Sequence, residues 1–178
     1  GGARRAQPLV APAAWLSVDC DAVVVACGGA GVPRLGSAGV CQNLISAKGI
    51  TVSPLQSSNC GFECTVSDYL RDRYAGTAVK SIAITVTHPG LPQVREVGEF
   101  VLTEYGVEGS LIYRLSAQIR TIIAERGSCQ IVLDLAPEQN CEKLHKKLSA
   151  QRGSRSLSER VRRATGISGV KLALLREY

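Results

Sequence analysis

One segment constrains the fold of this chain more than any other. Residues 21–29 read DAVVVACGG, a continuous apolar run with three valines that ends in two glycines. Such a run is typical of a strand that is covered on both faces, as in a parallel sheet, and that is followed by a loop. We therefore predict a buried strand here. After it we predict a helix that Ser37 caps and that runs to about Lys48, where Gly49 stops it.

The middle of the chain predicts antiparallel strands with one helix embedded among them. Apolar residues alternate over residues 81–87, turn-forming residues follow in the segment HPGLP, and residues 94–103 complete an expected hairpin. From residue 110 the apolar residues recur at steps of three or four, which predicts a helix that ends at Gly127. Residues 129–135 alternate again and predict another strand.

The end of the chain predicts a group of short helices. One is expected over residues 138–150. A second opens with the capping box SLSE at residues 156–159 and runs to Thr165, and Ser168 opens a third. The predicted fold class is α+β, because the antiparallel strands and most of the helices occupy different parts of the chain.

The positive charge is concentrated in the last fifth of the sequence. Residues 142–178 hold ten basic and three acidic side chains, whereas the rest of the chain holds 11 and 12. Clustered basic residues attract phosphate groups, so a nucleic-acid-binding module is one hypothesis, and a solvated helical face or a protein-interaction surface is another. Tyr178 is the only aromatic residue in this stretch, which argues against binding single strands by base stacking but leaves duplex binding open.

Residue types exclude several other kinds of site. Seven cysteines, an odd number, predict reduced thiols in a cytoplasmic protein. Cys60 and Cys64 are the only close pair, and no further ligands follow at the spacing of a zinc site, so we expect no metal. His88 and His145 form no recognisable pair with a nucleophile, so catalytic residues stay unassigned. No apolar run approaches the ~20 residues of a membrane helix.

The glycines after the first predicted strand resemble part of a dinucleotide-binding fingerprint. Counted from Gly29 and Gly31, the position of the third glycine holds Arg34, and Pro33 interrupts the pattern. That third glycine allows the helix to pack closely in a true fingerprint. Two interpretations stay open, a plain loop and a loop whose backbone amides face a ligand phosphate or ring.

Five segments in a compatible order resemble a group of bacterial flavoproteins, the BaiN-type or aminoacetone-oxidase-like NAD(P)/FAD-dependent oxidoreductases. They are DAVVVACGGAGVPRLGSAG at residues 21–39, PLQSSNCGFEC at 54–64, GEFVLTEYGVEGSLIY at 98–113, IVLDLAP at 131–137 and RGSRSLSERVRRATGISGVKLALLRE at 152–177. The chain contains no methionine, which predicts either a processed initiator or a piece of a longer protein. The resemblance favours the second.

The resemblance implies three parts. Residues 1–50 are a remnant of the FAD-binding domain, residues 51–137 a β-barrel-like insert with one embedded helix, and residues 138–178 a basic helical subdomain. It implies FAD as cofactor, NAD(P)H as a candidate donor, and two partners, the remainder of the FAD-binding domain and a small-molecule substrate, with no membrane. It also implies that the loop after the first strand approaches the flavin, where backbone amides would face a reduced, anionic ring. The residues that match these positions are Gly28, Gly29, Arg34, Gly36, Ser37 and Gly39.

Two departures indicate a divergent subfamily. Many members carry a histidine and the triplet SGP where this chain has Glu104 and the run from Glu108 to Ser110. We therefore predict the substrate-side insert of an FAD-dependent oxidoreductase, without predicting its substrate. By itself the chain is expected to be inactive and to bind FAD weakly or not at all.

Overall fold

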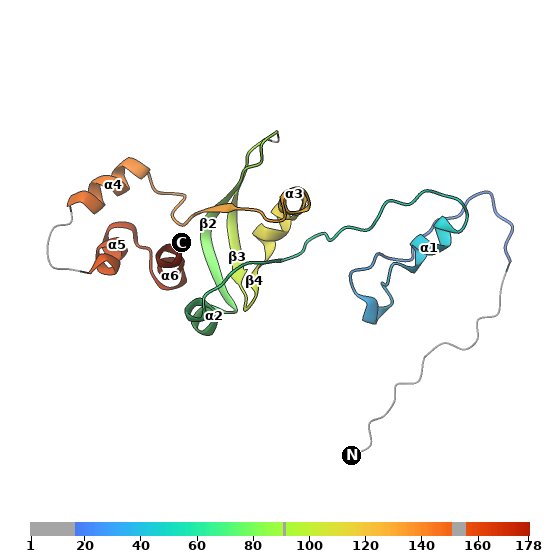
Figure 1. The fold of residues 1–178 in the computed structure, drawn as a ribbon, viewed down its shortest axis with the longest axis horizontal. Coiled ribbons are helices and arrows are strands. Elements are labelled where there is room, and N and C mark those ends of the chain that lie inside the picture. The colour runs from blue at the N-terminus through green and yellow to red at the C-terminus, as the bar shows by residue number, and fades with distance from the viewer. Residues whose placement is uncertain (1–16, 91, 151–155) are drawn as a thin grey trace, which may run out of the picture. The chain divides into compact units, whose positions relative to one another are not determined.

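The structure is a computed structural model that describes residues 17–90, 92–150 and 156–178. The chain divides into two compact units, Gly1–Leu55 and Gln56–Tyr178, which we call the N-terminal unit and the C-terminal unit (Figure 1). The first 16 residues of the predicted segment 1–50 lie outside the described residues. The division into three parts at residues 50 and 137 stays a prediction.

A five-stranded antiparallel sheet forms the centre of the C-terminal unit. Its spatial order is β1-β4-β3-β2-β5, and the strands are Phe62–Glu63 (β1), Thr77–Val86 (β2), Val94–Leu102 (β3), Gly106–Glu108 (β4) and Ile131–Asp134 (β5). The predicted hairpin is confirmed, since β2 pairs with β3 from Val86 opposite Val94. Strands β1 and β4 have two and three residues, too few for a recognisable alternation.

Helix α3 (Ser110–Arg126) packs on this sheet and completes its core (Figure 1). Its predicted apolar face is confirmed, because the side chains at the helical spacing are at most 4% exposed: Leu111, Leu115, Ile119 and Ile122. They pack with β2 and β3 residues such as Ile84 and Phe100. The predicted end at Gly127 is also confirmed, since this glycine has a φ of 78° and its N–H donates to the Ile123 carbonyl at 2.7 Å.

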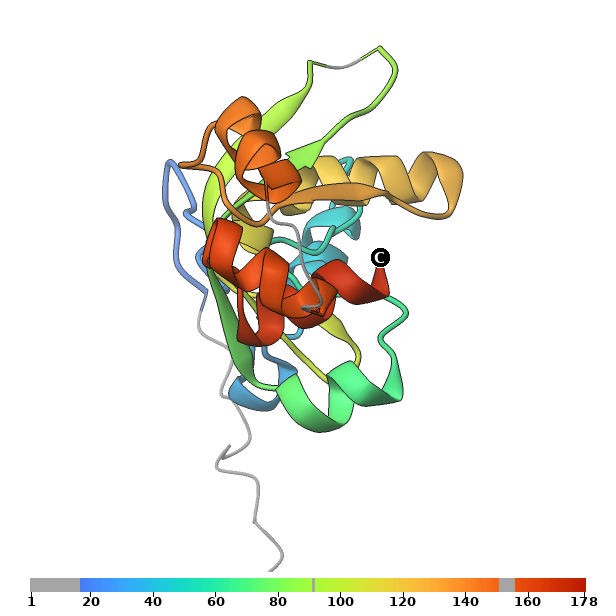
Figure 2. The ribbon, with the colours of Figure 1, turned by 90° about the vertical axis from the view of Figure 1, so that its left-hand side faces the viewer.

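Four shorter helices complete the C-terminal unit: α2 (Asp68–Tyr74), α4 (Cys141–Ala150), α5 (Leu157–Thr165) and α6 (Gly169–Glu177). Figure 2 shows α4, α5 and α6 grouped together, in orange to red. The predicted cap of α5 is confirmed, since Ser156 Oγ accepts a hydrogen bond from Glu159 N at 3.3 Å. Helix α4 begins later than expected because Asn140 caps it, with its Oδ1 accepting from Lys143 N at 3.1 Å. The α+β fold class is confirmed.

Two predictions for the N-terminal unit are wrong. A buried strand over residues 21–29 is wrong for this chain, because the structure has no strand there and Val23 and Val24 are 76% and 89% exposed. A strand depends on a neighbour for its backbone hydrogen bonds, and the described part of this unit contains no strand that could pair with it. The elements present are a 3-10 helix, η1 (Pro33–Leu35), and one helix, α1 (Val40–Ser46).

The predicted helix cap at Ser37 is also wrong. Helix α1 begins after Gly39, which has a φ of 71° and gives no side-chain cap. Ser37 instead forms an isolated antiparallel bridge with Val32. The left-handed turns at Gly36 and Gly39 keep the chain out of the helical conformation between these two positions, so the helix is shorter than expected.

Candidate functional site

Of the six residues predicted to contact a cofactor, five lie in one closed loop of the N-terminal unit, and Gly28 directly precedes it. The loop is closed by the backbone N–H of Gly39, which donates to the Gly29 carbonyl at 3.0 Å. Inside it, Gly36 N donates to the Pro33 carbonyl at 3.1 Å and Ser37 N to the Val32 carbonyl at 3.2 Å. The structure therefore brings residues 29–39 together, and their contact with a flavin stays a prediction.

Backbone geometry explains three of the glycines. Gly28, Gly36 and Gly39 have φ values of 72°, 91° and 71°, a conformation that side chains other than glycine rarely adopt. At Gly39 a Cβ atom would lie 3.2 Å from Leu55 Cδ1, so that position is also crowded. Gly29 differs, because a Cβ atom there would meet nothing within 4 Å. The space beside Gly29 is thus open to a ligand.

The loop could contact one edge of a cofactor, but it does not form a pocket that would enclose one. The amides of Gly36, Ser37 and Gly39 donate to carbonyls within the loop and are not available to a ligand. The amides of Gly28 and Gly29 donate to no residue among those that the structure describes. Arg34 of the same loop is exposed. Two backbone donors and one guanidinium suit an anionic edge, but residues 28–38 are almost all exposed and provide no walls.

Several cations of the basic helices already have partners. Glu159 accepts from Arg163 Nε at 2.7 Å and from Arg162 Nη2 at 2.8 Å. These two guanidinium groups, Arg163 first, hold the pKa of Glu159 below its usual value. The Lys171 ammonium donates to the carbonyls of Ser81 and Leu135, both at 2.8 Å, and its partial burial lowers its pKa. Some of the positive charge in this region therefore forms ion pairs and hydrogen bonds within the fold, which the sequence does not reveal.

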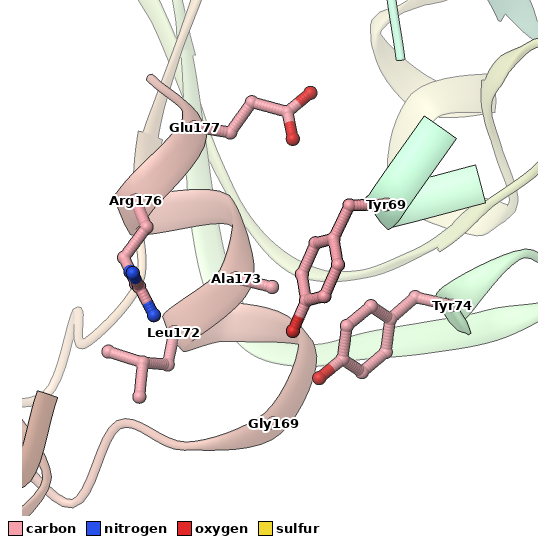
Figure 3. Close-up of a pocket in the computed structure, with 7 residues that line it drawn as sticks. All are labelled: Tyr69, Tyr74, Gly169, Leu172, Ala173, Arg176 and Glu177. Carbon is pink, nitrogen blue, oxygen red and sulfur yellow. The ribbon is translucent and has the colours of Figure 1, made fainter. Parts of the chain in front are cut away.

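A hollow of about 400 Å³ lies between α2 and α6 in the C-terminal unit. Tyr69 and Tyr74 of α2 line one side, and a stripe of α6 that includes Ala173 and Arg176 lines the other (Figure 3). None of these residues is among the site residues predicted from the sequence. The sequence does contain one signal for them. Ser67 and Asp68 are suited to open a helix, and Tyr69 and Tyr74, two of the chain's five tyrosines, follow within it.

The close cysteine pair has no third metal-ligating side chain gathered with it among the described residues. Cys60 and Cys64 are free thiols, and burial, followed by the negative charge of Glu177, raises the pKa of Cys64. Among the described residues, no three His, Cys, Asp or Glu side chains gather to hold a metal ion. A raised pKa leaves Cys64 a weak nucleophile at neutral pH.

The C-terminal unit matches a protein family as a whole. The family model is described as the HI0933-like protein barrel and H2TH domain, and it covers residues 56–178. The chain belongs to this HI0933-like flavoprotein family. The curled sheet with α3 corresponds to the barrel in this description, and the helices that follow correspond to its helical part.

The chain is also similar to one curated protein, a reductase, at low sequence identity. The 3-dehydro-bile acid delta(4,6)-reductase of Clostridium scindens is 25% identical to this chain over 126 residues. The aligned region covers 71% of this chain and 30% of the reductase, so the chain spans less than a third of the length of this relative.

The HI0933-like match begins after the glycine loop. Residues 28–39 precede residue 56, so their assignment as cofactor-binding residues stays a prediction. In contrast, the hollow between α2 and α6 lies inside the matched segment. Helices long and apolar enough to cross a membrane are absent from residues 17–90, 92–150 and 156–178.

Proposed function

We propose that this chain is the substrate-side insert of an FAD-dependent oxidoreductase and has no activity by itself. The observation that carries the proposal is the family match over residues 56–178 in a chain that spans 30% of its reductase relative. The fold places a barrel and a helical part after a glycine loop, the order that an insert following a flavin-contacting segment would have. We propose a cytoplasmic location, because seven free cysteines suit a reducing compartment.

In this proposal the glycine loop contacts the flavin of the complete protein. FAD would supply the hydride-transfer chemistry, with NAD(P)H as the donor and a small molecule as the acceptor. The amides of Gly28 and Gly29 would donate to the electron-rich edge of the ring, and Arg34 would add positive charge beside it. The backbone turns at Gly36 and Gly39 would hold those two amides in place, since their own N–H groups are used within the loop.

The exposed apolar run before the loop supports a proposal about the partner. Val23, Val24 and Val25 are between 52% and 89% exposed. A strand of this composition is stable when neighbouring strands and helices cover it. We propose that the run pairs with the remainder of the FAD-binding domain, which would also supply the walls that the glycine loop lacks.

Flavin titration tests this proposal. FAD fluorescence should be unchanged when this chain is added alone, whereas the complete protein encoded by the same gene should purify with one flavin per chain. In that complete protein, Gly29→Val should lower flavin content, because its side chain would fill the open space beside the loop. Gly31→Val is the matched control, since a Cβ atom at Gly31 also meets nothing within 4 Å. Stoichiometric flavin on the 178-residue chain, or equal losses in both variants, would contradict the proposal.

A nucleic-acid-binding or protein-interaction module is the alternative. One observation favours it, namely that Lys143, Lys146 and Lys147 are exposed on α4 and form no ion pair with the described residues. Phosphate contacts by these lysines would give duplex binding that weakens steeply with salt. A gel shift of a DNA duplex between 50 and 200 mM salt separates the two functions, because the insert should give no shift at either concentration.

A further inference from the structure

The hollow between α2 and α6 has an aromatic side and a small-residue side. Tyr69 and Tyr74 stand edge to face, with ring centroids 6.1 Å apart and planes at 70°. Opposite them, α6 presents Gly169 and Ala173, and Figure 3 shows both phenol hydroxyls close to this part of the helix. Because neither Gly169 nor Ala173 has a long side chain, the surface facing the two rings leaves room for a flat group.

A contact between the start of α2 and the end of α6, together with core packing, holds the two helices against each other. The Glu177 carboxylate at the end of α6 accepts from the backbone N–H of Ser67 at 2.9 Å and from its hydroxyl, at the start of α2. Below the hollow, Leu70 and Leu174 are at most 5% exposed and belong to the core. The walls are therefore fixed before any ligand arrives, as in most small-molecule sites.

Three polar side chains at the hollow, those of Arg176, Tyr69 and Tyr74, have no partner among the described residues. Arg176 is exposed, lies beside Leu172 at the rim in Figure 3, and forms no ion pair or side-chain hydrogen bond with the residues that the structure describes. The hydroxyls of Tyr69 and Tyr74 likewise have no hydrogen-bond partner in the described parts of the chain. The nearest carboxylate, that of Glu177, is engaged by Ser67. The hollow thus offers a positive charge and two hydroxyl donors.

We infer that this hollow binds a small molecule with a planar ring and a carboxylate. A volume of about 400 Å³ falls within the range of small-molecule sites, which is about 300–1,000 Å³. The ring would lie between the tyrosines and the stripe of Gly169 and Ala173, where aromatic faces and edges contact flat groups well. The carboxylate would reach Arg176, whose guanidinium can donate a fork of two hydrogen bonds to its two oxygens.

This site is independent of the flavin proposal. All of its residues lie in the C-terminal unit, whereas the proposed flavin contacts lie in the N-terminal unit. Loss of ligand binding at the hollow would leave the flavin titration unaffected, and a failed flavin titration would leave the hollow unaffected. The two proposals can therefore fail separately.

Titration of the 178-residue chain with 2-naphthoate, followed by fluorescence, tests the inference. The unsubstituted chain should bind 2-naphthoate at least tenfold more tightly than the neutral 2-naphthamide. Arg176→Gln should weaken naphthoate binding about tenfold and leave naphthamide binding unchanged, because a charge-assisted hydrogen-bond pair is lost. Tyr69→Ala should weaken both, because it removes one wall.

Matched controls use residues of the same type away from the hollow. Arg126→Gln at the end of α3 and Tyr105→Ala in the turn before β4 each change an exposed side chain that does not line it. Both should bind naphthoate like the unsubstituted chain. All four substituted side chains are exposed, so circular dichroism should show an intact fold. Equal weakening by Arg126→Gln and Arg176→Gln, equal affinity for naphthoate and naphthamide, or no binding of naphthoate would overturn the inference.

Discussion

Lys171 of α6 donates a hydrogen bond to the carbonyl oxygen of Ser81 in β2, with Nζ and O 2.8 Å apart. Ser81 has a φ of 49° and lies where the pairing of β2 with β3 shifts register. A bulge of this kind leaves a backbone group outside the sheet ladder. Since the same ammonium also donates to the Leu135 carbonyl at 2.8 Å, Lys171 joins the helical part to two segments of the sheet.

Lys171→Met should therefore destabilise the C-terminal unit. The substitution keeps most of the side-chain volume but leaves the Ser81 and Leu135 carbonyls without their donor. We expect the free energy of unfolding to fall by about 1–3 kcal/mol, measured by urea denaturation. Lys146→Met on the exposed side of α4 is the control and should change it by less than about 0.5 kcal/mol. Equal stability of the two variants would show that the Lys171 contacts contribute nothing.

Glu159→Gln should remove an acid-sensitive stabilisation of α5. Hydrogen bonds from Arg163 and then Arg162 hold the pKa of Glu159 below its usual 4.5. The unfolded chain therefore binds this proton more readily than the folded chain. The stabilisation is complete above pH 4.5 and is lost as the pH falls through the lower pKa of the folded state. In urea denaturations at pH 7, 5 and 3, the unsubstituted chain should exceed the variant at pH 7 and 5 and approach it at pH 3.

A control variant separates this local effect from general acid destabilisation. Glu142→Gln removes an exposed carboxylate of α4 that forms no ion pair with the described residues. Its difference from the unsubstituted chain should stay small at all three pH values. A gap between the unsubstituted chain and Glu159→Gln that stays constant down to pH 3 would rule out the proposed linkage.

Sequence patterns correctly predicted the elements whose contacts are made between residues close together in the chain. The helix over residues 110–126 has its buried side chains at the expected spacing and ends at the expected Gly127. At the cap of α5, Ser156 Oγ accepts from the backbone N–H of Glu159, three residues away, so the sequence contains everything that this cap needs. The hairpin of β2 and β3 likewise needs only one short turn to bring its strands together.

Features that depend on distant residues could not be predicted in the same way. The run DAVVVACGG has the composition of a buried strand, but strand formation depends on partners that the described part of this unit does not contain. Lys171 is one of ten cations in its region, and only the folded sheet brings it to Ser81. The hollow joins Tyr69 to Ala173, more than 100 residues apart, so no spacing rule could identify it.

Gly106→Ala should disrupt the pairing of β1 with β4. A Cβ atom on Gly106 would lie 2.1 Å from the Phe62 carbonyl oxygen, closer than any non-bonded contact allows. The two strands would have to separate, and we expect a loss of about 1–3 kcal/mol in the free energy of unfolding by urea. Gly127→Ala is the comparison. A Cβ atom on Gly127 would meet nothing within 4 Å, so the substitution should cost only the conformational penalty of its φ of 78°, about 1–2 kcal/mol.

The two glycine variants differ in what spectroscopy should detect. In Gly106→Ala the amide resonances of Phe62, Cys64 and Val107 should shift, because they lie in or beside the displaced pairing. In Gly127→Ala the shifts should stay near the end of α3. Unchanged β1 resonances in Gly106→Ala would mean that the strands accommodate the methyl group without separating.

Ser67 should contribute to stability through two contacts at once. Its hydroxyl accepts a hydrogen bond from Leu70 N at 3.2 Å, which caps α2, and it donates to the Glu177 carboxylate at the end of α6. Ser67→Ala is expected to cost about 1–3 kcal/mol in the free energy of unfolding, because a cap and a charge-assisted hydrogen bond are lost together. Ser156→Ala, which removes only the cap of α5, should cost about 1 kcal/mol.

A double-mutant cycle isolates the contact between α2 and α6. If Ser67 and Glu177 stabilise each other, Ser67→Ala combined with Glu177→Gln should cost less than the sum of the two single variants, by about 0.5–3 kcal/mol. Urea denaturation of the four proteins measures this coupling. The backbone N–H of Ser67, which also donates to Glu177, is retained in every variant, so the coupling reports on the side-chain contact alone. Additive effects would mean that the cap at Leu70 accounts for the whole contribution of Ser67.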